Sequence, residues 1–180
     1  MNLLLSEALQ LARMGYSVCA CEAWGATPVT ERGLLDATQD ETTIRAWWAR
    51  WPEANVAVVL SRGVIVVDAG PGWPATQSEA ASIRSLKPPT AIGPHDGRQY
   101  WFRVPPDCSG CYATKRLAPN ATIHTAGSYV LVAPSYTQDG YYGWANYLVP
   151  PDELPLVPDW LAVRLLPATA LTDEPKGGAL

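Results

Sequence analysis

The sequence predicts an α+β domain. Its 180 residues are 48% hydrophobic, and a chain of this length buries most of the apolar surface that its unfolded form exposes. Runs of β-branched residues separated by glycine-containing turns predict short strands, and apolar residues at helical spacing predict several helices. No apolar run approaches the roughly 20 residues that a membrane-spanning helix requires. Mixed helices and hairpins in one chain of this size favour α+β packing.

The first two helices are predicted from apolar spacing and terminal signals. Residues 4–14 place apolar side chains on one face, and Gly15 follows where a helix C-cap stands. Thr38 and Glu41 have the spacing of a capping box. Beyond it, apolar residues at helical spacing predict a helix that ends at Pro52: Ile44, Trp47, Trp48 and Trp51. A tryptophan stripe can stack on bases, but at this spacing it favours a place in the core.

The remaining elements follow from turn signals. Thr76 and Glu79 begin a predicted helix over 75–86, and a short helix is predicted over 159–165. Strands are predicted at 16–21, 56–60, 64–68, 99–104, 121–124, 128–133 and 141–145. Only residues 61–63 separate the second and third of these strands, which predicts a hairpin at the centre of the sheet.

The chain is expected to hold one domain over residues 1–150. A C-terminal extension with the short helix covers 151–166, and a flexible tail covers 167–180, where small, polar and glycine residues cannot form a core. The first residues lack the positive charge of a signal peptide, and Glu7 interrupts the apolar stretch that such a peptide needs. The predicted location is therefore the cytoplasm.

The charge balance excludes a protein that holds nucleic acid mainly by broad phosphate neutralisation. The net charge is −4, whereas such proteins carry a basic surface. Any contact with nucleic acid must therefore be local. The positive groups expected near a site are Arg98, Arg103, Lys115 and Arg116, although for each residue taken alone an ordinary solvated surface is the favoured interpretation.

Four cysteines form two closely spaced pairs. They are Cys19 and Cys21, and Cys108 and Cys111. Side chains two residues apart on a strand share a face, and a Cys-x-x-Cys loop can hold a metal, so a structural zinc site is possible. The alternative is that the first pair fills a core strand as small apolar side chains.

Several motifs resemble one known family. Residues 33–40 hold an Asp-Ala-Thr turn, residues 44–58 hold a Trp-Trp-x-x-Trp-Pro helix end followed by Ala54 and Asn55, and residues 129–135 hold Tyr-Val-Leu-Val-Ala-Pro-Ser. Together these stretches resemble the bifunctional DNA primase/polymerase (prim-pol) domain of the archaeo-eukaryotic primase superfamily, over about residues 5–145. The resemblance implies an RRM-like sheet that bears Asp68, packed with a smaller N-terminal α/β portion that contributes the tryptophan helix.

The resemblance also implies a catalytic site, and this chain departs from it. The family uses carboxylates to bind divalent metal and a histidine to hold phosphates. Its first motif, Asp-x-Asp, is here Asp68 followed by Gly70. Its histidine aligns with Gln99 and its third carboxylate with Thr122, while a nearby basic position is His124. Asp68 is then the vestigial member of a metal site, and alone it would hold Mg²⁺ or Mn²⁺ weakly.

Other residues are predicted to line the same cleft. Asp96 or His95, on the loop before the second motif, could replace the missing ligand, although both suit an ordinary exposed turn. Arg98 follows on that strand. Asn55 is expected to tie down the turn between helix and strand, and Ser135 to hold the far side of the site.

Three functions fit these features. The first is a catalytically degenerate prim-pol-like domain that binds nucleotide or single-stranded nucleic acid as an accessory in the replication of a phage or plasmid type of mobile element. The second is an active but divergent DNA primase/polymerase built on Asp68, Asp96 and an unidentified third ligand. The third is a protein-interaction module whose cleft is filled by Tyr100 and Trp101. No P-loop motif is present, so a helicase or other replication partner would be a separate chain.

Overall fold

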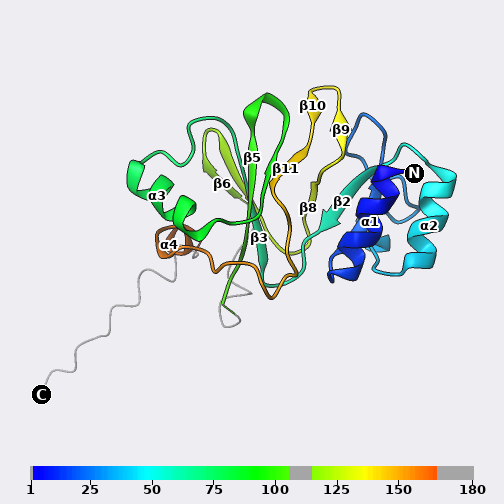
Figure 1. The fold of residues 1–180 in the computed structure, drawn as a ribbon, viewed down its shortest axis with the longest axis horizontal. Helices are drawn as coiled ribbons and strands as arrows, with labels where there is room; N and C mark the ends of the chain where they lie inside the picture. Colours follow the sequence, from blue (N-terminus) through cyan, green and yellow to red (C-terminus); the bar gives the residue numbers. More distant parts are fainter. Residues whose placement is uncertain (1, 106–114, 166–180) are drawn as a thin grey trace, which may run out of the picture.

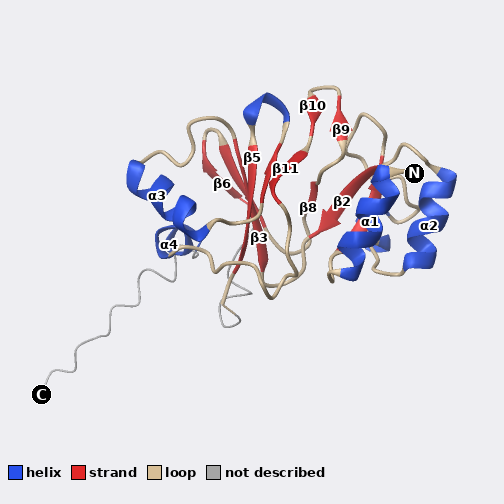
Figure 2. Ribbon diagram, in the orientation of Figure 1, coloured by secondary structure: helices blue, strands red, loops and turns tan. Residues whose placement is uncertain are grey.

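The computed structural model describes residues 2–105 and 115–165, which form two antiparallel sheets, a small hairpin and four helices (Figures 1 and 2). The strand order is β1-β2-β8 in the first sheet and β11-β4-β5-β3-β7-β6 in the second. Helices α1 and α2 lie beside the first sheet, and α3 and α4 lie at the opposite end of the molecule (Figure 1). The predicted α+β class is confirmed.

The elements have the following bounds. The helices are α1 (Leu3–Arg13), α2 (Glu41–Arg50), α3 (Gln77–Leu86) and α4 (Asp159–Leu165). The strands are β1 (Ser17–Cys21), β2 (Asn55–Val59), β3 (Val64–Ala69), β4 (Thr90–Ile92), β5 (Arg98–Arg103), β6 (Lys115–Ala118), β7 (Ala121–His124), β8 (Tyr129–Leu131), β9 (Tyr136–Thr137), β10 (Gly140–Tyr141) and β11 (Gly143–Asn146). Strands β4, β6 and β9 were not predicted, and the single strand predicted at 141–145 is divided between β10 and β11. The predicted tail lies outside the described residues.

The second helix is capped differently from the prediction. Asp40 is its N-cap, and the Asp40 carboxylate accepts hydrogen bonds from the Thr43 backbone N–H and hydroxyl, both at 2.7 Å. The predicted capping box at Thr38 is wrong, because Thr38 instead forms a β-bridge with Val18. The tryptophan stripe faces the core, as predicted. Ile44 and Trp48 are buried there, and Trp47 and Trp51 are partly buried against it. The capping box of α3, between Thr76 and Glu79, is also confirmed.

The predicted central hairpin between β2 and β3 is wrong. The turn at residues 61–63 is present, with the Val64 N–H donating to the Ser61 carbonyl, but the two strands enter different sheets. Strand β2 pairs with β8 and strand β3 pairs with β7, so two antiparallel segments of chain run through both sheets. Between the sheets, Leu60 donates to the Ser128 carbonyl and accepts from the Gly127 N–H. Long-range pairing has therefore outweighed the local turn signal.

Strand β3 divides the interior into two cores. Because side chains alternate along a strand, Val64 and Val66 face the core shared with the first sheet, α1 and α2, while Ile65 and Val67 face the core under α3 and α4. Asp68 continues the first of these faces. The carboxylate is thus carried on the side of the second sheet that faces the first sheet.

Candidate functional site

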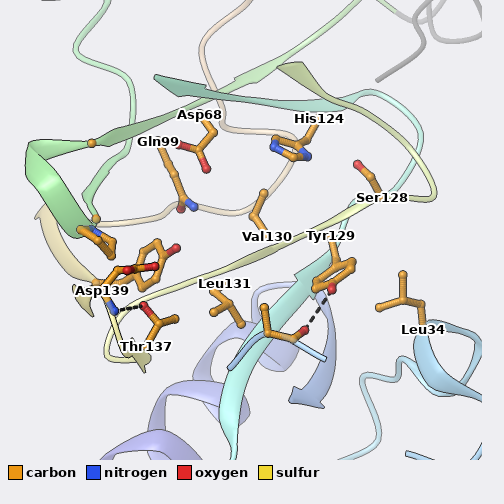
Figure 3. A pocket seen from close by; sticks show the side chains of 15 residues that line it. Leu34, Asp68, Gln99, His124, Ser128, Tyr129, Val130, Leu131, Thr137 and Asp139 are labelled. Carbon is orange, nitrogen blue, oxygen red and sulfur yellow. Dashed lines mark hydrogen bonds between the residues drawn. The ribbon is translucent and has the colours of Figure 1, made fainter. Parts of the chain in front are cut away.

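A cleft of about 690 Å³ opens where the two sheets meet. Its walls include Asp68 on β3, Gln99 on β5 and His124 on β7 from the second sheet, and Tyr129, Val130 and Leu131 on β8 from the first (Figure 3). The volume lies in the range of about 300–1,000 Å³ that is usual for small-molecule sites. This cleft is the candidate functional site.

Strand register brings the three polar residues of the second sheet together. Asp68 is paired across the ladder with Gln99 on one side and Thr122 on the other, and His124 is paired with Val66. Directly opposed residues of antiparallel strands point to the same face, and residues two apart on one strand also share a face. Asp68, Gln99 and His124 therefore lie on one surface, and Figure 3 shows their side chains side by side.

Burial dominates the electrostatics of this group. It raises the pKa of Asp68, while the His124 charge and hydrogen bonding to Gln99 act in the opposite direction. Burial also lowers the pKa of His124, against the attraction of Asp68. Desolvation disfavours the charged form of each group, so the carboxyl and imidazole are each driven toward neutrality.

The lowered pKa of His124 predicts an acid-sensitive stability. Above the ordinary value of 6.5 the imidazole is neutral in both folded and unfolded chains. As the pH falls through 6.5 toward the folded-state pKa, the unfolded chain takes up the proton first, so stability is lost in that window. The fall in Tm between about pH 7.5 and about pH 5.5 should be smaller in His124→Gln than in the wild type.

The matched control for this experiment is His95→Gln. The His95 side chain is 79% exposed, so its replacement shows whether the loss of any histidine has the effect expected for the buried His124. Equal slopes for His124→Gln and the wild type would contradict the prediction.

Two further predicted residues line an adjoining groove. Gly70 and Thr122 lie there with Arg116 and Asn120, and Asp68 and His124 are shared between the groove and the cleft. The Arg116 guanidinium donates to the carbonyls of its own turn, at residues 118 and 119. The aligned motif positions thus surround Asp68, but they bring no second carboxylate to it.

Arg98 and Ser135 lie elsewhere. Arg98 precedes Gln99 on β5, so its side chain points to the opposite face, where it lines a separate pocket with Trp73 and Tyr100. Ser135 is fully buried, and its hydroxyl accepts from the Val56 N–H at 2.8 Å and donates to the Val56 carbonyl at 3.1 Å. The serine therefore fastens the chain after β8 to β2.

The loop residues His95 and Asp96 are exposed on a short 3₁₀ turn, Pro94–Asp96, with left-handed φ values of 55° and 59°. His95 lies 3.9 Å from Asp139, on the turn between β9 and β10. Asp96 is not among the residues that line the cleft. The part of Asp96 in a metal site therefore stays a prediction.

The side chains around Asp68 do not fit a polymerase metal site. Within residues 2–105 and 115–165, no three His, Cys, Asp or Glu side chains are grouped closely enough to hold a metal ion. Hard divalent cations need several oxygen ligands with anionic charge, whereas the strands next to Asp68 bring it an amide and an imidazole. The other carboxylate in the described lining of the cleft, Asp139, belongs to no such group of ligands.

Of the predicted zinc ligands, Cys19 and Cys21 are buried on β1 against Ala57 and Leu131. Cys108 and Cys111 lie outside the described residues. The structural zinc site stays a prediction.

Sequence reasoning missed part of the cleft. Asp139 and Tyr142 also line it, beside the β9–β10 hairpin. Burial raises the pKa of the Tyr142 hydroxyl, and the carboxylates of Asp68 and Asp139 add to that shift. The signal available was the Asp139-Gly140 turn, but only the tertiary fold shows that this turn lies over the cleft. Tyr100 and Trp101, expected to fill the cleft, are buried outside it.

None of the helices in the described part of the chain is long and apolar enough to cross a membrane.

Comparison with known proteins agrees with the family resemblance of the motifs. A search of curated proteins found no match to the chain. The family described as "Bifunctional DNA primase/polymerase, N-terminal" matches residues 8–160, which include both sheets and the cleft. The chain therefore belongs to the bifunctional DNA primase/polymerase N-terminal domain family and is a replication-associated, primase/polymerase-like domain.

Proposed function

We propose that this chain is a catalytically degenerate prim-pol domain that binds nucleotide or single-stranded nucleic acid. The observation that carries the proposal is the cleft itself, where Asp68 stands with Gln99 and His124 and without a second carboxylate on the adjacent strands. Gly70 and Thr122 occupy the positions at which the family's other carboxylates are expected. We further propose an accessory role in replication of a phage or plasmid type of element, in the cytoplasm, with any helicase on a separate chain.

The proposed loss of catalysis follows from charge. Metal-dependent nucleotidyl transfer depends on cations that neutralise the phosphates and align the attacking oxygen. Cations at such a site are held by several anionic oxygens. A single carboxylate whose pKa is raised by burial resists the ionised form that a cation requires. The residues present thus favour ligand binding over transfer chemistry.

Binding of single strands is supported by an aromatic row beside the cleft, formed by Trp24, Tyr136 and Tyr141. The Trp24 and Tyr136 ring centroids are 4.6 Å apart, and those of Tyr136 and Tyr141 are 5.8 Å apart. Trp24 and Tyr141 are 53% and 69% exposed. Exposed aromatic rings bind bases by stacking, with about 1–3 kcal/mol lost per base on alanine substitution.

Primer synthesis tests the loss of catalysis. The full chain, incubated with a single-stranded template, deoxynucleotides and either Mg²⁺ or Mn²⁺, is expected to yield no template-dependent product. Products that disappear in Asp68→Ala would overturn the degenerate assignment in favour of the active, divergent polymerase. If such products appear, Asp96→Ala tests whether the Asp96 carboxylate, on the loop before β5, is also needed for primer synthesis.

Oligonucleotide binding tests the retained function. Fluorescence anisotropy with a labelled single strand should show binding that weakens by at least about tenfold in the double variant Trp24→Ala/Tyr141→Ala. The matched control is Val163→Ala, which shortens a 52% exposed apolar side chain on α4, away from the row. If neither oligonucleotides nor nucleotides bind or raise Tm, the protein-interaction module becomes the better account.

A further inference from the structure

The cleft carries the wrong charge for a triphosphate. Its walls include two carboxylates, Asp68 and Asp139, and none of the described residues that line it is lysine or arginine. Arg116, which lines the adjoining groove, already donates to two carbonyl oxygens. Phosphates are held by cationic donors, which the described lining of the cleft lacks, and a carboxylate repels them once it is ionised. The cleft is therefore suited to a neutral or cationic ligand.

Gln99 shows which polar groups such a ligand should present. Its side chain is 2% exposed, and Oε1 is buried with no hydrogen-bond partner among the described residues. An unsatisfied buried acceptor destabilises the protein, and a ligand that donates a hydrogen bond to it removes that cost. The terminal amide torsion of glutamine has a broad energy profile, so the oxygen can turn to meet a donor in the cleft. Next to it on β3, Asp68 offers a second acceptor.

The remaining walls suit a flat, apolar ring. Leu131 and Tyr129, two residues apart on β8, share one face, and Tyr142 packs with them and adds aromatic surface. The Tyr129 hydroxyl donates to the Ala26 carbonyl at 2.9 Å, which fixes the orientation of that ring. A ligand that places an amino group against Gln99 and Asp68 could thus lay its ring against this surface.

We propose that the cleft binds the amino-bearing ring of a nucleobase, in preference to the phosphates of a nucleoside triphosphate. An exocyclic amino group has two N–H donors, which match the two acceptors of Gln99 and Asp68. The same chemistry is presented by a free nucleoside and by a base of a single strand. The inference rests on the proposed function and narrows its ligand to the base.

Matched nucleosides test the inference. Isothermal titration of the full chain compares cytidine with uridine and adenosine with inosine, because each pair exchanges an amino group for a carbonyl. Cytidine or adenosine is expected to bind at least about tenfold more tightly than its partner, since a site built for a donor rejects a ligand that lacks it. Cytidine triphosphate should bind no more tightly than cytidine. Equal affinity within both pairs overturns the inference.

Two variants locate the contact. Gln99→Met removes the amide acceptor from a side chain of similar length, and Asp68→Leu removes both carboxylate oxygens at a similar side-chain size. Each should reduce the preference for cytidine by about tenfold while apo Tm remains close to that of the wild type. The control is Gln39→Met, because the exposed Gln39 amide donates only to the Gly15 carbonyl. A preference that survives Gln99→Met overturns the assignment.

The outcomes also separate this inference from the proposed function. If triphosphates bind more tightly than nucleosides, and Arg116→Gln removes the gain, phosphate recognition is established and the base inference fails, while nucleotide binding stands. If oligo-dC binds in a Gln99-dependent way and free cytidine does not bind, the bound base comes from a single strand. If free cytidine binds in a Gln99-dependent way and oligo-dC does not bind, the ligand is a free nucleoside. If neither nucleosides, triphosphates nor oligonucleotides bind, both proposals fail together.

Discussion

Replacement of Asn55 by Asp is expected to lower the free energy of unfolding by about 3–5 kcal/mol, the range for an uncompensated buried charge. Asn55 is fully buried, and its Nδ2 donates to the carbonyls of Glu22 at 3.2 Å, Gly25 at 2.8 Å and Tyr136 at 2.6 Å. Its Oδ1 accepts from the Tyr136 N–H at 2.9 Å. Aspartate has nearly the same shape, but it would direct an acceptor at three carbonyl oxygens.

The pH dependence identifies charge as the cause. An aspartate at this position should have its folded-state pKa raised by burial and by the facing carbonyls. The part of the stability loss that comes from the aspartate charge is therefore absent below the unfolded-state pKa and grows as the pH rises toward and through the folded-state pKa. Denaturant unfolding of Asn55→Asp should accordingly show a partial recovery of stability at acidic pH, relative to the wild type at the same pH.

The control is Asn120→Asp. Asn120 is exposed and makes one side-chain hydrogen bond, to the Pro71 carbonyl at 2.7 Å, so the change should cost less than about 1 kcal/mol. Similar losses in the two variants would contradict the role of Asn55. Because Asn55 anchors both the loop that holds Trp24 and the start of β9, its loss should also weaken oligonucleotide binding under conditions where the variant is still folded.

Asn55 also shows where sequence reasoning succeeds and where it stops. Its place at the entry to a strand indicated an anchoring role, and the expected partner was the preceding turn. The observed partners include Tyr136, 81 residues away. Helices were predicted well because their caps and apolar spacing are local, as in α3. The β2–β3 hairpin was predicted from an equally local turn, and that turn exists, but strand pairing was decided by β7 and β8.

In the candidate site too, the positions set by local strand geometry were predictable and those set by long-range packing were not. The family resemblance placed Gln99 at the site beside Asp68, and alternation along the strand of residues 121–124 predicted that His124 faces the same cleft. Alternation also separates Arg98 from Gln99, because adjacent residues of a strand point to opposite faces. Asp139 and Tyr142 belong to a different case. They reach the cleft through the position of the β9–β10 hairpin, which depends on packing between segments far apart in the sequence.

Trp101→Ala is the second variant for which a large effect is expected, a loss of about 3–5 kcal/mol. Trp101 lies on β5 of the second sheet, two residues beyond Gln99, and is fully buried in the core shared with the first sheet. Its ring packs edge-on against Tyr16 with centroids 5.9 Å apart, and lies 6.4 Å from Trp144. The cavity left by its removal would lie where the two sheets are held together.

Phe102→Ala is the comparison that separates the loss of packing between the two sheets from a general loss of core packing. Phe102 is also fully buried, but it faces the other core, under α3 and α4. Both variants should lower the unfolding midpoint in denaturant by comparable amounts. Only Trp101→Ala should also weaken cytidine binding at temperatures where both variants are folded, because it alone loosens the face that carries Gln99. Equal binding by the two variants would show that the cleft is shaped by the second sheet alone, without the contact between the sheets.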